Sequence, residues 1–318
     1  ASNGASNIRL NAGTAVTTTS VSAGTTDINT LLVRSSNTAA GTLNITSGAT
    51  LRLGASGGVL LASGAGAFTI AGGTLTAGGA SNTPGELLLI NSLNNPNSGS
   101  VLTVNSVIAD NGSGPVSLVI SGWGQKALGV TNTYTGGTII ENGRVLLNAN
   151  PSALSTGPIT VQTGGQAMAN AGTFTQALFL SGAGTTESPA YGAIRADNVT
   201  VAGTVLTGGT LSISRDAVLG SGMLTFGGGN LLLTGTTAFA SSRSIAVNPG
   251  NVTAVNVAIP SGAVLTGTIS GLGGIAKGGS YSLTLAGPLA YSGSTIVDQG
   301  TLIFANTPTV AGGSLIFG

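Results

Sequence analysis

Carboxylate side chains are the groups in this chain best suited to chemistry, and two of the eight acidic residues stand out by their spacing. Asp197 and Asp216 lie 19 residues apart, and each is close in sequence to an arginine. In coils of about 20 residues, with strands stacked about 4.8 Å apart, both carboxyl groups would face one groove. Glycosidic cleavage needs two carboxyl groups about 5 to 9.5 Å apart, so this pair is the best enzyme candidate. The alternative, which we favour, is a solvated ionic ladder worth about 0 to 1 kcal/mol per pair. Arg34 and Arg52, 18 residues apart, allow similar interpretations without a nearby acid.

The chain has few other residue types that could support catalysis. The chain contains no His and no Cys, which removes Ser-His-Asp catalysis, thiolate chemistry and the usual transition-metal ligands. The string from Gly54 to Gly58 (Gly-Ala-Ser-Gly-Gly) matches a nucleophile elbow, but no helix is expected after it. The stretch from Gly271 to Lys277 superficially suggests a phosphate loop, yet no Ser or Thr follows the lysine, and we expect a corner there. We therefore predict that the protein is not an enzyme and has no catalytic residue, no cofactor and no metal site.

Aromatic side chains offer a different kind of site. If Tyr134, Tyr191, Tyr281, Tyr291 and Trp123 were exposed together, their rings could stack on the sugars of a glycan. These rings are scattered along the sequence, however, and Tyr134 and Tyr291 occupy equivalent positions in a repeated segment. We favour a structural role, in which each ring fills a corner or covers the edge of a coil.

Composition limits both the class of protein and its partners. Of the 318 residues 54 are glycine, 41% are hydrophobic and only 5% are charged, with a net charge of +1. Disordered chains combine low hydrophobicity with high charge, so this chain is expected to fold. The nine lysines and arginines are scattered singly, whereas nucleic-acid binding needs a basic stripe, so no nucleic acid is expected as a partner. No run of about 18 apolar residues occurs, and we expect no membrane insertion.

Short runs rich in Val, Ile, Leu and Thr recur along the chain, mostly about 7 to 12 residues apart, which is typical of an all-β protein. Most runs alternate apolar and polar residues, as in Gly41 to Ile45 and Ala49 to Leu53. Such strands bury one face and leave the other face wet. A β-sandwich, a propeller and a parallel β-helix all remain compatible with this pattern.

Turn chemistry separates these architectures. Sandwich hairpins favour Asn-Gly or Asp-Gly between reversing strands. Here the strands are separated by corner-like strings such as Gly72 to Leu75 and Gly208 to Leu211, in which glycine supplies the positive φ of a corner. The low aromatic content, 4%, also argues against a propeller or an antibody-like sandwich. We predict an elongated, single-stranded parallel β-helix, or β-solenoid, that forms one continuous domain over residues 1–318.

One cassette occurs twice, in Asn132 to Leu147 and in Leu289 to Ile303, with Tyr, Gly, Thr, an acidic residue and Gly at identical spacing. Related patterns occupy Gly271 to Gly287 and Gly209 to Leu231. These segments resemble the autotransporter-associated β-strand repeat of bacterial surface proteins, and the resemblance is most evident in residues 106–318. It implies a right-handed β-helix that is extracellular or displayed at the bacterial cell surface, without a cofactor.

Self-association is expected at the two ends of the predicted β-helix, because Ala1 to Asn11 contain only one charged residue, Arg9, and Gly312 to Gly318 contain none, so neither segment is expected to cap the end against strand addition. No translocator barrel follows the repeats, so we expect either a segment of a longer protein or a repeat used in another assembly. The candidate self-association residues are Ile8, Arg9, Leu10, Ser314, Leu315, Ile316 and Phe317.

The function expected from this pattern is a non-catalytic structural or adhesive extracellular module. Its partner is another copy, joined end to end into a fibre, or neighbouring repeats of a longer chain in a cell-surface stalk. One alternative is a passenger segment of a larger autotransporter adhesin that binds host or surface ligands, such as a glycan. The second alternative is a polysaccharide-active β-helix enzyme that uses Asp197 and Asp216.

Overall fold

The structure is a computed structural model that describes residues 5–12, 17–35, 40–93, 99–147, 150–169, 172–182, 184–185, 192–196, 199–201, 204–206, 208–219, 223–306 and 313–318. The chain divides into two compact units. Unit 1 comprises Ala1–Thr160 and Gly164–Ala169, and unit 2 comprises Val161–Thr163 and Asn170–Gly318. One continuous domain over residues 1–318 therefore stays a prediction.

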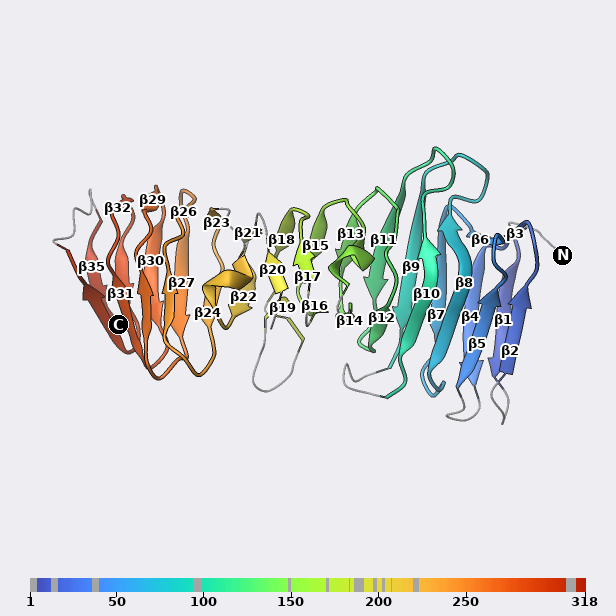
Figure 1. Cartoon of the computed structure of the whole chain (residues 1–318), viewed down its shortest axis with the longest axis horizontal. Coiled ribbons are helices and arrows are strands. Elements are labelled where there is room, and N and C mark those ends of the chain that lie inside the picture. Colours follow the sequence, from blue (N-terminus) through green and yellow to red (C-terminus); the bar gives the residue numbers. More distant parts are fainter. Residues whose placement is uncertain are drawn as a thin grey trace. The chain divides into compact units, whose positions relative to one another are not determined.

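Unit 1 contains two parallel sheets between which the chain alternates (Figure 1). The first sheet has the order β1 (Asn7–Ala12), β4 (Thr30–Ser35), β7 (Ser56–Leu61), β9 (Gly85–Asn91), β11 (Val116–Ser121), β13 (Thr138–Ile140) and β15 (Ile159–Val161). The second has the order β2 (Thr17–Val21), β5 (Gly41–Ile45), β8 (Phe68–Ala77), β10 (Leu102–Ile108), β12 (Lys126–Leu128), β14 (Gly143–Leu146) and β16 (Gly165–Ala169). Two further strands, β3 (Thr25–Asp27) and β6 (Thr50–Leu53), form a short ladder that continues onto the second half of β8.

Unit 2 repeats this alternation and adds a third ladder. One strand series is β18 (Leu178–Leu180), β21 (Thr204–Leu206), β23 (Leu224–Phe226), β26 (Ile245–Val247), β29 (Ile269–Gly271) and β32 (Leu289–Tyr291). The next is β19 (Ile194–Ala196), β22 (Thr210–Ile213), β24 (Asn230–Leu233), β27 (Val252–Val257), β30 (Gly274–Gly278), β33 (Thr295–Val297) and β35 (Leu315–Phe317). The third is β25 (Phe239–Ser241), β28 (Ala263–Leu265), β31 (Ser282–Leu285) and β34 (Thr301–Phe304), and a separate pair joins β17 (Gly172–Phe174) to β20 (Val199–Val201).

Every strand pair of these ladders with an assigned register is parallel, for example β5 with β8 and β27 with β30. Among the described residues, the helical segments are two short 3-10 turns, η1 (Pro151–Leu154) and η2 (Asp216–Leu219). The prediction of an all-β protein with parallel strands is therefore confirmed. The reversing hairpins that a sandwich requires do not connect the named strands of the described part.

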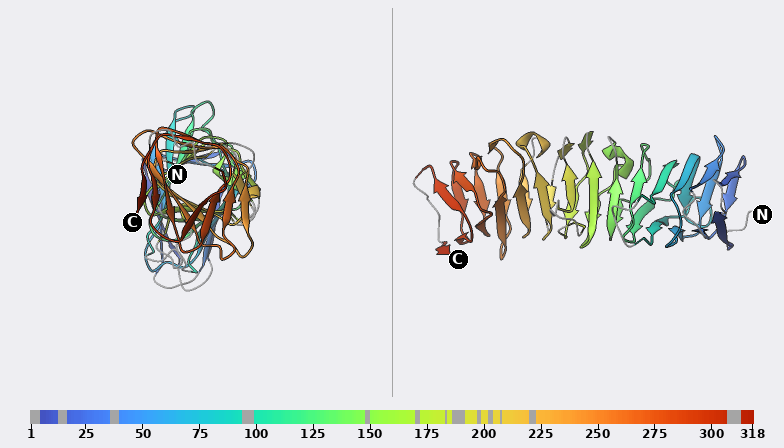
Figure 2. Two further views of the ribbon diagram at one scale, coloured as in Figure 1. Left: turned by 90° about the vertical axis from the view of Figure 1, so that its left-hand side faces the viewer. Right: turned by 90° about the horizontal axis from the view of Figure 1, so that it is seen from below.

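The core consists of aliphatic side chains stacked in columns along each sheet. Leu43, Ile70, Val104 and Leu128 are register partners on consecutive strands, and each is at most 4% exposed. We call one passage of the chain through both sheets a round; within unit 1, strands of consecutive rounds lie side by side in the right-hand view of Figure 2. Burial of each such side chain stabilises the fold by about 1.5 to 3 kcal/mol, so the alternating pattern sets the register of each strand.

Close backbone stacking restricts the residues at the corners. Gly143 begins β14 with a φ of 72°, and Gly300 holds the equivalent cassette position with the same φ. A Cβ atom at Gly143 would lie 2.3 Å from the carbonyl oxygen of Gly122, one round earlier. A Cβ atom at Gly300 would lie 2.5 Å from the carbonyl oxygen of Gly279. Glycine is therefore required at these corners both by the left-handed conformation and by the neighbouring backbone.

Replacement of corner glycines tests this stacking. Gly143→Ala should lower the free energy of unfolding by about 1 to 3 kcal/mol more than Gly48→Ala, measured by urea denaturation. Gly48 also has a positive φ, 78°, but a Cβ atom there meets open space, so its substitution measures the conformational cost alone. Equal losses in the two variants would show that Gly143 is not in contact with a previous round.

Candidate functional site

The predicted self-association residues lie on edge strands of their own units. Ile8, Arg9 and Leu10 belong to β1, which pairs with β4 on one side and with no described strand on the other. Leu315, Ile316 and Phe317 form β35, which pairs with β33 and likewise has one free side among the described strands. The side chains of β35 are unusually exposed for their size, at 51%, 44% and 74%. Ser314 precedes the strand, and its carbonyl oxygen accepts a hydrogen bond from the Thr295 amide at 2.9 Å.

Of the two carboxylates considered for catalysis, Asp216 is among the described residues and Asp197 lies outside them. Asp216 opens η2, where its Oδ1 accepts a hydrogen bond from the Ser241 hydroxyl at 2.5 Å and lies 3.6 Å from Arg243 Nε. These contacts give the Asp216 carboxylate a structural role between a turn and the neighbouring ladder. Within the described part of the chain, no group of three or more acidic residues could hold a metal ion.

The two glycine-rich motifs form neither a nucleophile elbow at Gly54 to Gly58 nor a phosphate loop at Gly271 to Lys277. Ser56 begins β7 directly after a corner, so the Gly54 to Gly58 string joins two strands and no helix follows it. Gly271 to Gly273 form a corner, but Lys277 lies within β30 and is fully buried. The expectation of a corner therefore holds only for the first residues of that stretch.

Both lysines of the chain are buried in cages of backbone carbonyl groups. Lys126 Nζ donates hydrogen bonds to the carbonyl oxygens of Gly122, Gly124 (2.8 Å) and Asn142 (3.2 Å). Lys277 Nζ donates to those of Gly278 (2.6 Å), Gly279 (2.8 Å) and Gln299 (2.9 Å). Asn142 and Gln299 are equivalent cassette residues, each directly before the corner glycine described above. An ammonium group has three donors, so each cage satisfies its lysine completely without a carboxylate.

The repeated tyrosines serve packing and are not a sugar platform. Tyr134 and Tyr291 are fully buried, and each hydroxyl lies 2.6 Å from the hydroxyl of a threonine four residues later, Thr138 and Thr295. Burial raises the pKa of both tyrosines, and the threonine hydrogen bond opposes this shift to a smaller extent. Of the other rings, Trp123 and Tyr281 are partly exposed, and Tyr191 lies outside the described residues.

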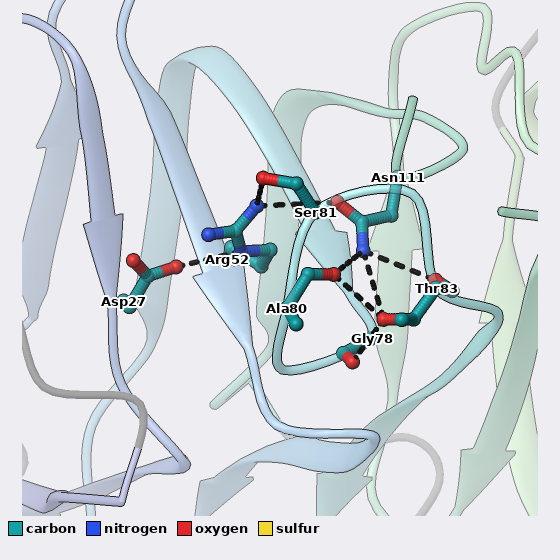
Figure 3. A network of polar contacts seen from close by, with 7 residues as sticks. All are labelled: Asp27, Arg52, Gly78, Ala80, Ser81, Thr83 and Asn111. Atoms are coloured by element: carbon teal, nitrogen blue, oxygen red, sulfur yellow. Dashed lines mark hydrogen bonds and ion pairs between the residues drawn. The ribbon is translucent and has the colours of Figure 1, made fainter. Parts of the chain in front are cut away.

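A polar cleft in unit 1, with a volume of about 320 Å³, is large enough to hold a small ligand. Its side chains come from the β3–β6–β8 ladder and from two loops, residues 78–84 and 109–115. Arg52 is the centre of the polar network beside it, since Nε donates to Asp27 Oδ1 at 2.6 Å and Nη1 donates to Ser81 Oγ at 2.6 Å (Figure 3). Asn111, 4% exposed, donates from Nδ2 to the carbonyl oxygens of Ala80 and Thr83 and so fixes one loop.

Sequence reasoning missed this cleft, although a signal for it exists. Arg52 has no acidic residue close to it in the sequence, but Asp27 is its register partner one round earlier, 25 residues away. The string Thr-x-Asp at 25–27 is followed by Thr-x-Arg at 50–52 and Thr-x-Thr at 74–76, and these three strings are aligned in the ladder. A search for polar residues at spacings of 24 to 25 would have found them.

Comparison with known proteins gave no match to a family model, to a curated protein or to a solved structure. Among the described residues, no helix has the length and apolar character needed to span a bilayer.

Stability should depend on pH through the caged lysines. Burial lowers the pKa of Lys126 from 10.5 to about 7, and it lowers the pKa of Lys277 as well. Between pH 7 and 10.5 the unfolded chain therefore holds more protons than the folded chain, so the free energy of unfolding should rise with pH by up to about 1.4 kcal/mol per unit for such a group. Below pH 7 both states are protonated and the full cost of burying the charge is present.

The measurement is the urea midpoint between pH 6 and 10. Lys126→Met should flatten the rise, whereas Arg34→Met, which removes an exposed cation that lies in no lysine cage, should leave it unchanged. A Lys126→Met variant with the same pH dependence as the natural chain would contradict a neutral, caged lysine.

Proposed function

We propose that this chain is a non-catalytic structural module of a bacterial surface or extracellular β-solenoid, which lengthens by parallel addition of further coils at its edge strands. The proposal takes the parallel sheets to belong to one single-stranded, right-handed β-helix of the autotransporter-associated repeat type. The added coils come from another copy, joined end to end in a fibre. In the alternative, they are neighbouring repeats of a longer passenger that forms a cell-surface stalk.

The observation that carries the proposal is the exposed edge of β35. An edge strand presents a row of unpaired amide and carbonyl groups, and β35 adds three large exposed apolar side chains to that row. In the same series β22, β24, β27, β30 and β33 each have a strand on both sides, whereas β35 has one free side among the described strands. The chemistry that fits this edge is another parallel strand with apolar residues in register.

The contacts of three acidic residues, Asp27, Asp110 and Asp216, support a structural role over a catalytic one. Asp27 is paired with Arg52, and Asp216 is bound by Ser241. The carboxylate of Asp110 accepts hydrogen bonds from the Val116 amide and from the amide and hydroxyl of Thr135. Each of these carboxylates is therefore engaged in holding a neighbouring strand, turn or loop.

End-to-end assembly gives the most direct test of this function. An unpaired edge on one copy and a different unpaired edge on the next make a heterologous contact, which propagates into a filament. Leu315→Lys and Ile8→Lys should each raise the concentration at which filaments form by about tenfold or more, because tenfold corresponds to only about 1.4 kcal/mol. Electron microscopy and sedimentation velocity measure this threshold.

A matched control is Val264→Lys, because Val264 is 36% exposed but lies on β28, between β25 and β31. This variant should assemble like the natural chain, and circular dichroism should show all the variants folded. If the chain remains monomeric at high concentration and neither edge lysine has an effect, the fibre proposal is rejected. The edge strands would then be explained by the alternative, a segment of a longer passenger.

A further inference from the structure

The polar cleft of unit 1 has a regular row of hydroxyl groups along one side. Thr25, Thr50 and Thr74 are consecutive register partners on β3, β6 and β8, so their side chains follow one another at about 4.8 Å per strand. All three line the cleft, together with Thr76 and Ser81. Each hydroxyl both donates and accepts a hydrogen bond, so the row can match a ligand that carries several hydroxyl groups in sequence.

Hydrogen bonds within the protein fix the two charged side chains that line the cleft, Arg52 and Asp110, without a bound ligand. The Arg52 side chain is 12% exposed and is fixed by Asp27 and Ser81, and a longer contact of 3.5 Å joins Nη1 to Asn111 Oδ1. Among the hydrogen bonds of the described residues none involves Arg52 Nη2, which leaves one edge of the guanidinium group available as a donor. Asp110 is held by backbone and side-chain donors and still has acceptor capacity. A fixed set of polar groups lowers the entropy cost of binding.

The lining also excludes other ligand classes. Its charged residues are Arg52 and Asp110, and Asp27 lies behind Arg52, so the local charge is zero or negative and does not favour an anion. Large apolar and aromatic side chains are absent from its lining, whose residues are all described, so a hydrophobic ligand finds no partner. A volume of about 320 Å³ lies at the small end of the range for ligand pockets, about 300 to 1,000 Å³.

We propose that this cleft binds one neutral sugar residue of a glycan through the hydroxyl row, Arg52 and Asp110. The sugar hydroxyls donate to Asp110 and to threonine oxygens and accept from Arg52 and from threonine hydroxyls. The site uses no ring stacking, so the affinity for a single sugar is in the millimolar range. The proposal does not depend on the assembly proposed above, because every residue of the cleft belongs to unit 1 and none lies on β1 or β35.

Titration of the folded chain with glucose, galactose, mannose and N-acetylglucosamine, followed by protein NMR, tests the site. At least one of these sugars should shift the amide signals of residues 50–52, 74–76 and 110–112 in a saturable way. The double variant Thr50→Val and Thr74→Val, which keeps the side-chain shape and removes two hydroxyls, should weaken binding by tenfold or more. Ser81→Ala, on an exposed loop, provides a second variant that leaves the strands intact.

The matched control is the double variant Thr69→Val and Thr103→Val. These threonines are register partners of intermediate exposure on β8 and β10, and they are not part of the cleft. Binding should be unchanged in this variant. The proposal is overturned if no sugar in the panel binds at tens of millimolar, if sulfate or glucuronate binds more tightly than the neutral sugars, or if the control pair loses binding equally. Sugar binding by a chain that stays monomeric would support the sugar site and reject the fibre. Filaments formed by a chain that binds no sugar would support the fibre and reject the sugar site.

Discussion

In-register stacking of each strand on the strand of the previous round is the constraint on which the other features depend. Because the backbones of consecutive rounds are hydrogen-bonded neighbours, a corner that comes too close to the previous round admits no Cβ atom, as at Gly143 and Gly300. The same stacking turns alternation along one strand into continuous columns, apolar inside and polar outside. A sequence with 54 glycines and few charged residues is suited to this architecture.

The same stacking accounts for the unusual polar groups of the interior. Three backbone carbonyl oxygens converge on each caged lysine, and a buried carbonyl without a donor is costly. Lys126 and Lys277 each donate hydrogen bonds to three of these oxygens, one of which, on Asn142 or Gln299, belongs to the following round, so each side chain links a corner to the next round. Register also creates the cleft, since it aligns Asp27 with Arg52 and places three threonines in one row. At the ends of the ladders, stacking leaves the open edges of β1 and β35.

Much of the fold could be predicted because alternation and corner glycines are local signals. The run Gly41 to Ile45 coincides with β5 and has the expected alternating burial, whereas Gly72 to Leu75, expected as a corner between strands, lies within the single strand β8, where Gly72 has a positive φ. Contacts between residues that are far apart in the sequence were harder to predict. The two lysine cages could not be found from the repeat, because the lysines stand at different distances from their cassette tyrosines. Lys126 precedes Tyr134 by 8 residues, whereas Lys277 precedes Tyr291 by 14, since the additional strand β31 lies between them. The Asp27–Arg52 pair spans 25 residues, so it becomes visible only when the length of a round is known.

Spin-label distances test the in-register stack most directly, because the natural chain has no cysteine to interfere with labelling. Thr42, Thr69, Thr103 and Ala127 are consecutive register partners on β5, β8, β10 and β12. Cysteine pairs that join position 42 to 69, 103 and 127 in turn should give mean label separations that increase by about 4.8 Å at each step. Separations that do not increase in this order, or that place position 127 closer to 42 than 103 is, would contradict the parallel stack.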